Sequence, residues 1–208
     1  MVNKPAGLPT QATLDKNRLH VYGILQAQLK AVEPNLLLAL HHRLDRDTSG
    51  VLLFCKDRAY NEKVGQMFQQ HQFKKIYWAL TKKNLCQAQW TVKSFLAEKP
   101  APRSKRMSLH SVKSGGKIAI THFEKMGEAH DSLWIQAQPQ TGRMHQIRVH
   151  LSECGLPILG DDLYYPNSAK APRMMLHAYQ LIFDHPATAQ AMCITAPAPQ
   201  DFVLTRYA

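Results

Sequence analysis

The sequence lacks the features that mark secreted and membrane proteins. Its longest apolar runs are short pieces such as LLLAL and VLLFC, far below the roughly 20 apolar residues that a membrane-spanning helix needs. Its first residues, MVNKPAGLPT, have neither a charged region followed by an apolar one nor a small-residue cleavage site, so they do not resemble a secretory signal. We therefore expect a cytoplasmic protein that does not associate with a membrane.

Cysteine is also sparse, and no two cysteines form a CxxC pair: they are Cys55, Cys86, Cys154 and Cys193. In a cytoplasmic chain such residues are expected to be reduced, mostly buried thiols, not disulfides or zinc ligands. Eleven histidines are present, but there is no HExxH motif and no Cys/His quartet. Glycine-rich loops that cradle phosphates are missing as well. We therefore expect no metal and no other cofactor.

Acidic residues are few relative to basic ones. There are 15 Asp and Glu against 26 Lys and Arg, a formal net charge of +11. This excess favours a polyanionic partner, and nucleic acid is the first choice. An anionic membrane surface would also attract the charge. With 208 residues, 45% of them apolar, the chain is long enough for one globular domain with a substantial core.

The periodicity of apolar residues predicts more strands than helices. Helices are predicted at 16–32, 59–71 and 143–154, and strands at 35–42, 51–56, 73–81, 131–139, 174–183 and 191–196. Residues 99–125 are rich in basic side chains and predict a charged hairpin or arm, with SGG at 114–116 as a turn. The predicted fold class is α+β, a mixed, largely antiparallel sheet with a few packed helices.

The helix predicted at 143–154 has the best-defined ends, with Thr141 as N-cap and Gly155 as stop. Arg148 falls about 40° from Met144 on a helical wheel. Its guanidinium therefore borders the buried stripe and needs a partner. Arg143 would lie in the first turn, where a cation opposes the positive end of the helix dipole. A nearby phosphate or carboxylate would explain a cation there.

Residues 41–50, HHRLDRDTSG, place one acid, Asp45, between Arg43 and Arg46. An aspartate close to one or two arginines has its ionised form favoured. Asp45 is therefore expected to be a carboxylate at neutral pH, able to act as a nucleophile or to orient another group. The same spacing also fits an ordinary ion pair that fixes a loop, and charge alone leaves both interpretations open.

Several segments resemble, in order, the signatures of the RluA-like RNA pseudouridine synthases. They are VNKPAGL at 2–8, HRLDRDTSGVLLFCKD at 42–57, FKKIYWAL at 73–80, QTGRMHQIRVHLSECGLPILGDDLYY at 140–165 and LHAYQLIFDHP at 176–186. The resemblance covers almost the whole chain. It implies the pseudouridine synthase catalytic fold, with a central RNA-binding cleft, as a single domain over residues 1–208 that is one sheet of one or two lobes.

The resemblance also implies roles for particular residues. Asp45 corresponds to the family's catalytic aspartate, and Arg43 to the arginine implicated in everting the target nucleotide and filling the vacated space. Tyr77 corresponds to the aromatic residue expected to stack on the everted uracil. The basic residue that pairs with the catalytic carboxylate corresponds to Arg148, with Arg143 as the alternative. A desolvated aspartate needs such a partner to stay ionised.

The implied activity is the isomerisation of specific uridines in structured ribosomal or transfer RNA, by covalent attack of the aspartate or through a glycal intermediate. The sequence leaves both routes open. Leu159, in GLPILGD, fits an apolar wall near the pocket or an ordinary core turn. Three basic residues of the predicted arm fit either RNA backbone contact or a solvated face: Arg103, Lys105 and Arg106.

No separate RNA-binding module is expected before the catalytic domain, so recognition is expected to come from that domain acting as a monomer on an exposed stem-loop. Two other function classes remain. One is an RNA-binding or RNA-folding factor on a synthase scaffold with little catalysis. The other is a metal-dependent nuclease, for which GDD at 160–162 is the nearest group of carboxylates.

Overall fold

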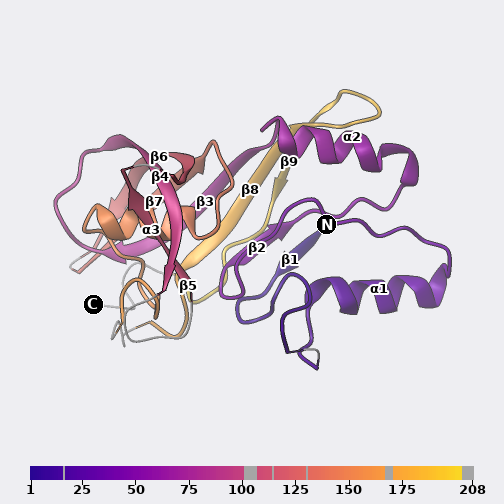
Figure 1. Ribbon diagram of the computed structural model, residues 1–208, viewed down its shortest axis with the longest axis horizontal. Helices are drawn as coiled ribbons and strands as arrows, with labels where there is room; N and C mark the ends of the chain where they lie inside the picture. The colour runs from indigo at the N-terminus through magenta and orange to yellow at the C-terminus, as the bar shows by residue number, and fades with distance from the viewer. Residues whose placement is uncertain (16, 101–106, 114, 130, 167–170, 203–208) are drawn as a thin grey trace. The chain divides into compact units, whose positions relative to one another are not determined.

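The computed structural model describes residues 1–15, 17–100, 107–113, 115–129, 131–166 and 171–202 (Figure 1). It divides into two compact units. Unit 1 is Met1–Lys74 with Ala178–Pro197, and unit 2 is Lys75–His177 with Ala198–Ala208. Three helices and nine strands lie in the described residues, and none of those helices has the length and apolar character needed to cross a membrane.

Unit 1 contains two helices and four strands. They are β1 (Val2–Lys4), α1 (Val21–Val32), β2 (Ser49–Leu52), α2 (Arg58–Gln69), most of β8 (Leu176–Asp184) and β9 (Ala191–Thr195). β1 pairs antiparallel with β2, and β9 pairs antiparallel with β8. In Figure 1, β1, β2 and β9 lie between α1 and α2. The buried side chains of α2, Val64 and Met67, pack in one cluster with residues of β2 and β8.

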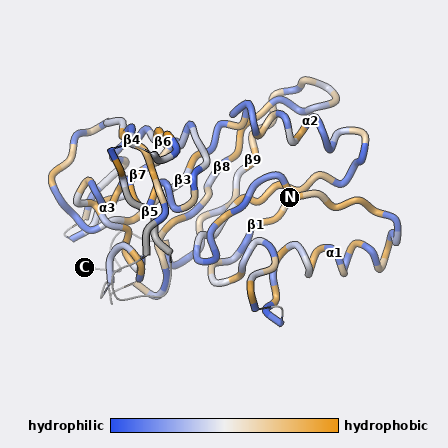
Figure 2. The backbone as a smooth tube through the Cα atoms, viewed as in Figure 1, coloured by the Kyte–Doolittle hydropathy of each residue, from blue (hydrophilic) through white to orange (hydrophobic). Residues whose placement is uncertain are grey.

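Both predicted helices of unit 1 are confirmed, but α1 begins at Val21, five residues later than predicted. α1 begins after His20, whose side chain accepts a hydrogen bond from the Gly23 amide, and it ends before Pro34. α2 begins after Asp57, whose carboxylate caps the Ala59 amide. Figure 2 shows α1 alternating between hydrophobic and hydrophilic residues, as expected for a helix with one buried face.

The prediction of a strand at 35–42 is wrong. The segment forms only an isolated bridge between Ala39 and Cys55. Side chains form hydrogen bonds with backbone groups that would otherwise pair in a sheet. The Tyr22 hydroxyl donates to the Leu38 carbonyl, and the Leu53 amide donates to His42 Nε2. Of the strand predicted at 51–56, only Val51 and Leu52 lie in β2, which begins earlier, at Ser49.

Gly50 in β2 is required by a close approach of two backbones. Its φ is +116°, and a β-carbon there would lie 2.2 Å from the Ala178 carbonyl oxygen. No other residue type fits both the conformation and the space. The glycine that ends HHRLDRDTSG therefore allows β2 to pack against β8 directly after the loop that carries Asp45.

Unit 2 is built on an antiparallel sheet with one helix. Its elements are β3 (Lys74–Lys82, in this unit from Lys75), β4 (Gln89–Pro100), β5 (Met107–Val112), β6 (Lys117–Glu128), β7 (Ser132–Pro139) and α3 (Gln146–Glu153). The strand order is β3-β7-β6-β4-β5, and each of these pairs is antiparallel. Leu133, Ile135 and Ala137 are buried as predicted. The predicted α+β class with a largely antiparallel sheet is confirmed.

The predicted charged hairpin around SGG differs from the observed pairing. β5 and β6 follow one another in the chain, but β4 lies between them in the sheet. Phe95 of β4 is paired with Val112 on one side and with Ile118 on the other. β5 and β6 are therefore not hydrogen-bonded to each other, although they follow one another in the chain.

The prediction that the cysteines are mostly buried is also wrong. All four are free thiols, but Cys154 and Cys193 are exposed and Cys86 is half-buried. Cys154 is the C-cap of α3, and Cys193 lies on the outward face of β9. Their positions at a helix end and on an exposed strand face explain the exposure.

Candidate active site

Asp45 lies half-buried in the loop that precedes β2. The residue before it, Leu44, is fixed through both of its backbone groups. The Thr10 hydroxyl donates to the Leu44 carbonyl at 2.8 Å. The Leu44 amide in turn donates to the hydroxyl oxygen of Thr10 at 3.1 Å. Thr10 and Leu44 are both buried, so this exchange takes place away from water and holds the backbone next to Asp45.

The residue after Asp45 is fixed by a buried lysine. Lys4 Nζ donates to the carbonyl oxygens of Pro5, Leu8 and Arg46 at 2.8, 2.7 and 2.8 Å. Lys4 is fully buried, and the three acceptors match the three N–H donors of an ammonium group. The backbone is therefore anchored on both sides of Asp45. The sequence did not predict this role for Lys4 or Thr10. Lys4 lies within VNKPAGL, whose resemblance was a signal for it, whereas Thr10 lies outside that segment.

Replacing Lys4 by Met should destabilise unit 1 by about 2–3 kcal/mol, because three carbonyl groups lose their bond to a buried charged donor. Any activity that depends on Asp45 should fall as well. Urea unfolding would measure the loss. Lys30→Met is the matched control, since Lys30 is exposed near the end of α1 and should change stability by less than about 0.5 kcal/mol. Equal stability of the two variants would contradict the anchoring role.

The two arginines beside Asp45 differ in their surroundings. Arg46 forms a bidentate ion pair with Asp47, with both N–O distances at 2.8 Å. Arg43 is exposed and forms no ion pair with another described residue. The guanidinium of Arg43 is therefore accessible to a ligand.

Tyr77 lies in β3 and is half-buried. It is in register with Ala137 of β7. Directly paired residues project from the same face of a sheet. The Tyr77 side chain therefore lies on the face that carries the buried residues Ile135 and Ala137. The predicted strand at 73–81 is confirmed by β3.

The helix predicted at 143–154 begins later than expected. α3 starts at Gln146, and its N-cap is His145, which has a left-handed backbone and no side-chain cap. The prediction of Thr141 as N-cap is wrong: its hydroxyl donates to Gln146 Oε1 and accepts from the Ile120 amide. The bond from Ile120 of β6 therefore helps to hold this side chain outside the helix. Gly155 ends the helix with a φ of +73°, as predicted.

Arg143 consequently lies in the loop before α3, not in its first turn. Its Nε donates to the Ile118 carbonyl at 2.9 Å, which fixes the direction of the side chain. Within the described part of the chain, no carboxylate forms an ion pair with it. This half-buried cation is therefore suited to bind an anion from outside the protein.

Arg148 lies on the buried side of α3, as predicted, and is 9% exposed. Its Nε and Nη2 donate to the two carboxylate oxygens of Asp161 at 2.7 and 2.8 Å. The guanidinium also lies 5.0 Å from the ring centre of Tyr164. Asp161 Oδ1 further accepts from the amides of Leu163 and Tyr164. Asp161 therefore has a structural role, and its charge is balanced by Arg148.

Leu159 is 6% exposed and belongs to the apolar core of unit 2. Its amide donates to the Leu80 carbonyl, which joins this turn to β3. The predicted RNA contacts Arg103, Lys105 and Arg106 lie outside the described residues.

His150 of α3 is fully buried between two hydroxyl groups. Its Nδ1 lies 3.0 Å from Thr121 Oγ1, and its Nε2 lies 3.0 Å from Ser94 Oγ. Burial lowers the pKa of His150 to about 4, because the charged imidazolium would lose its hydration. The neutral ring therefore joins α3 to β4 and β6.

Acidification should destabilise the protein through His150. A histidine in the unfolded chain has a pKa of about 6.5, so between pH 6.5 and 4 the unfolded state binds a proton that the folded state does not. The contribution of His150 to the free energy of unfolding is fully present above about pH 6.5. At pH 5 the free energy of unfolding should be about 2 kcal/mol lower. Urea unfolding at pH 7.5 and 5 would measure the difference. His150→Gln should flatten this dependence, whereas His122→Gln, at an exposed position, should not.

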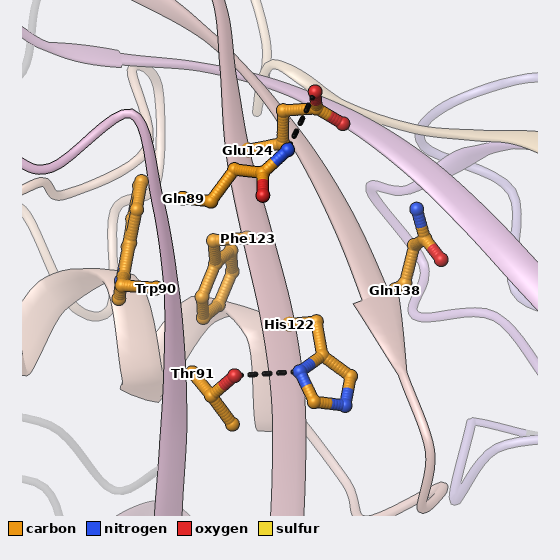
Figure 3. Close-up of a pocket in the computed structure, with 7 residues that line it drawn as sticks. All are labelled: Gln89, Trp90, Thr91, His122, Phe123, Glu124 and Gln138. Atoms are coloured by element: carbon orange, nitrogen blue, oxygen red, sulfur yellow. Dashed lines mark hydrogen bonds between the residues drawn. The ribbon is translucent and has the colours of Figure 1, made fainter.

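Unit 2 also has a hollow of about 360 Å³ on β4, β6 and β7. It is lined by Gln89, Trp90, Thr91, His122, Phe123, Glu124 and Gln138 (Figure 3). Two hydrogen bonds cross it, Thr91 to His122 at 2.6 Å and Gln89 to Glu124 at 3.1 Å. None of the predicted site residues is in this lining. The Glu124 carboxylate would repel a phosphate, so the hollow does not fit the predicted chemistry.

Known proteins resemble this chain in sequence and in fold. Residues 1–153 match the family model described as RNA pseudouridylate synthase. The ribosomal large subunit pseudouridine synthase C of Vibrio parahaemolyticus is 34% identical over 95% of this chain and 62% of its own length. The dual-specificity RNA pseudouridine synthase RluA of Pasteurella multocida is 34% identical over 95% of this chain and 88% of its own.

Among solved structures, the human protein called RNA pseudouridylate synthase domain containing 4 is similar to this chain with a TM-score of 0.77 and 28% identity. The similarity covers 96% of this chain and 85% of the human one. The chain spans about 62–66% of the length of the first curated relatives that it matches.

Proposed function

The chain belongs to the RNA pseudouridylate synthase family, and on that premise we propose that it is an isomerase that converts specific uridines of structured RNA into pseudouridine. The observation that carries the proposal is the loop around Asp45. Thr10 and Lys4 anchor the backbone on both sides of this half-buried carboxylate. A reactive group needs such support to hold its geometry.

The proposed reaction rearranges the nucleoside without loss of a heavy atom. The bond between uracil N1 and ribose C1′ breaks, a bond between C5 and C1′ forms, the C5 hydrogen leaves to water, and N1 takes a proton. Asp45 would begin it by attacking C1′ or by removing the 2′ proton, and both routes stay open. Arg43 would fill the space left by the everted nucleotide, and Tyr77 would stack on the uracil.

We propose Arg148 as the partner of the catalytic carboxylate. The two hydrogen bonds to Asp161 hold the Arg148 guanidinium in one orientation. A guanidinium oriented in this way can position a second carboxylate with little further loss of side-chain freedom. Arg143 would bind the substrate, since no carboxylate of the described residues pairs with it. Leu159 would contribute to the apolar wall behind the uracil.

We propose a stem-loop of ribosomal or transfer RNA as the substrate. The relative named for the ribosomal large subunit supports ribosomal RNA, and an unpaired loop base costs little to evert. The net charge of +11 would contribute sequence-independent backbone affinity, to which Arg103, Lys105 and Arg106 would add. The enzyme would act as a monomer, without a cofactor, in the cytoplasm, where these RNAs function.

The test is tritium release from total RNA labelled at uracil C5 and isolated from cells that lack this protein, with a metal chelator present. We expect the wild-type protein to release tritium, and mapping of the modified positions would then identify the substrate. Salt-sensitive RNA binding without release would instead support the RNA-binding factor. Release of nucleotides from the RNA in the absence of chelator, but not in its presence, would support the metal-dependent nuclease.

A further inference from the structure

Lys75 lies in β3, two residues before Tyr77. Side chains two residues apart project from the same face of a strand, about 6–7 Å from one another. Lys75 therefore shares its face with Tyr77, and both are half-buried. The neighbouring Lys74 projects from the opposite face and is exposed.

The Lys75 ammonium has no partner among the described residues: neither a hydrogen bond nor an ion pair joins it to them. Burial lowers the pKa of Lys75 below its ordinary value, and no carboxylate opposes this effect. A partly desolvated cation without a counter-charge is unfavourable in the free protein. An anion bound there would remove this cost.

The backbone beside Lys75 leaves room for an anion. A β-carbon placed on Gly142 would lie 3.8 Å from Lys75 Nζ, an ordinary van der Waals contact, so the side-chain-free backbone of Gly142 lies directly beside the ammonium. Gly142 is exposed and adopts no positive φ, so its backbone conformation does not require glycine. The next residue, Arg143, adds a second cation that has no carboxylate partner in the described chain.

On the basis of the proposed function, we propose that Lys75 binds a phosphate of the RNA backbone beside the uridine on which Tyr77 stacks. A phosphate supplies the charge that this ammonium lacks within the protein, and the bare backbone of Gly142 lets it approach. Lys75 is therefore a substrate-positioning residue, distinct from the groups that act on the uracil and the ribose.

The test compares Lys75→Met with Lys74→Met, which removes the same charge one residue away. Binding of a uridine-rich RNA hairpin would be measured over a range of salt concentrations, and tritium release from C5-labelled total RNA would give kcat and KM. For Lys75→Met we expect an affinity about tenfold lower, a higher KM and an unchanged kcat. The slope of log Kd against log salt should fall by about 0.7–1.

Lys75→Arg should keep the salt slope of the wild type, since it keeps the charge, and Lys74→Met should keep the wild-type affinity. Equal effects of Lys75→Met and Lys74→Met would overturn the proposal, because they would reflect net charge alone. A lower kcat with an unchanged salt slope would also overturn it. If the wild type releases no tritium, the proposed function fails, while the binding comparison still decides the role of Lys75.

Discussion

Replacing Asp45 by Asn should lower tritium release from C5-labelled RNA by about a thousandfold or more. An amide has nearly the shape of the carboxylate but carries no negative charge, so it can neither attack C1′ nor take the 2′ proton. The loop should keep its conformation, because its anchors at Leu44 and Arg46 are made by backbone groups. RNA affinity and stability should therefore stay close to those of the wild type.

Asp47→Asn is the matched control for this experiment. Asp47 lies in the same loop and pairs with Arg46 near the surface, so its loss removes one carboxylate without touching the proposed reaction. An exposed pair of this kind contributes at most about 1 kcal/mol. Tritium release by Asp47→Asn should be near that of the wild type. Substantial turnover by Asp45→Asn would remove Asp45 from the catalytic role.

Replacing Arg148 by Met should have the largest effect on stability. The change leaves the Asp161 carboxylate, whose side chain is 1% exposed, without its counter-charge. Breaking a buried pair in this way costs about 3–5 kcal/mol, which urea unfolding would measure. Tritium release should be lost as well, because Arg148 is the proposed partner of the catalytic carboxylate.

A double variant separates the two roles of Arg148. In Arg148→Met with Asp161→Leu, neither buried charge remains, and replacement of a whole buried pair by apolar residues is often close to neutral. Stability should recover in part, since the amides of Leu163 and Tyr164 still lose their acceptor. Tritium release should remain absent. If activity returned together with stability, Arg148 would have only a structural role.

Several features of the fold could be predicted because they depend on local patterns. Strand β7 alternates buried and less buried residues, and Leu133, Ile135 and Ala137 face inward as this alternation requires. Helix α2 follows the spacing of Val64 and Met67. Arg148 could be placed beside the buried face of α3 by counting residues along a helix. The family could be recognised because its motifs are long and lie in order.

The sequence by itself indicated the residues that we propose for the chemistry and determined the periodicity of most elements, because motifs and periodicity depend on neighbours along the chain. Tertiary structure alone decided which residues support them. Lys4 lies 42 positions from Arg46, and no local pattern distinguishes a buried lysine that bonds three carbonyls from a surface lysine. The start of α3 and the partner of Arg148 were likewise decided by contacts with β6 and Asp161. Hydrogen bonds and charge pairs between distant segments form only when folding brings both groups together, and buried groups such as Lys4 and Arg148 then require a partner.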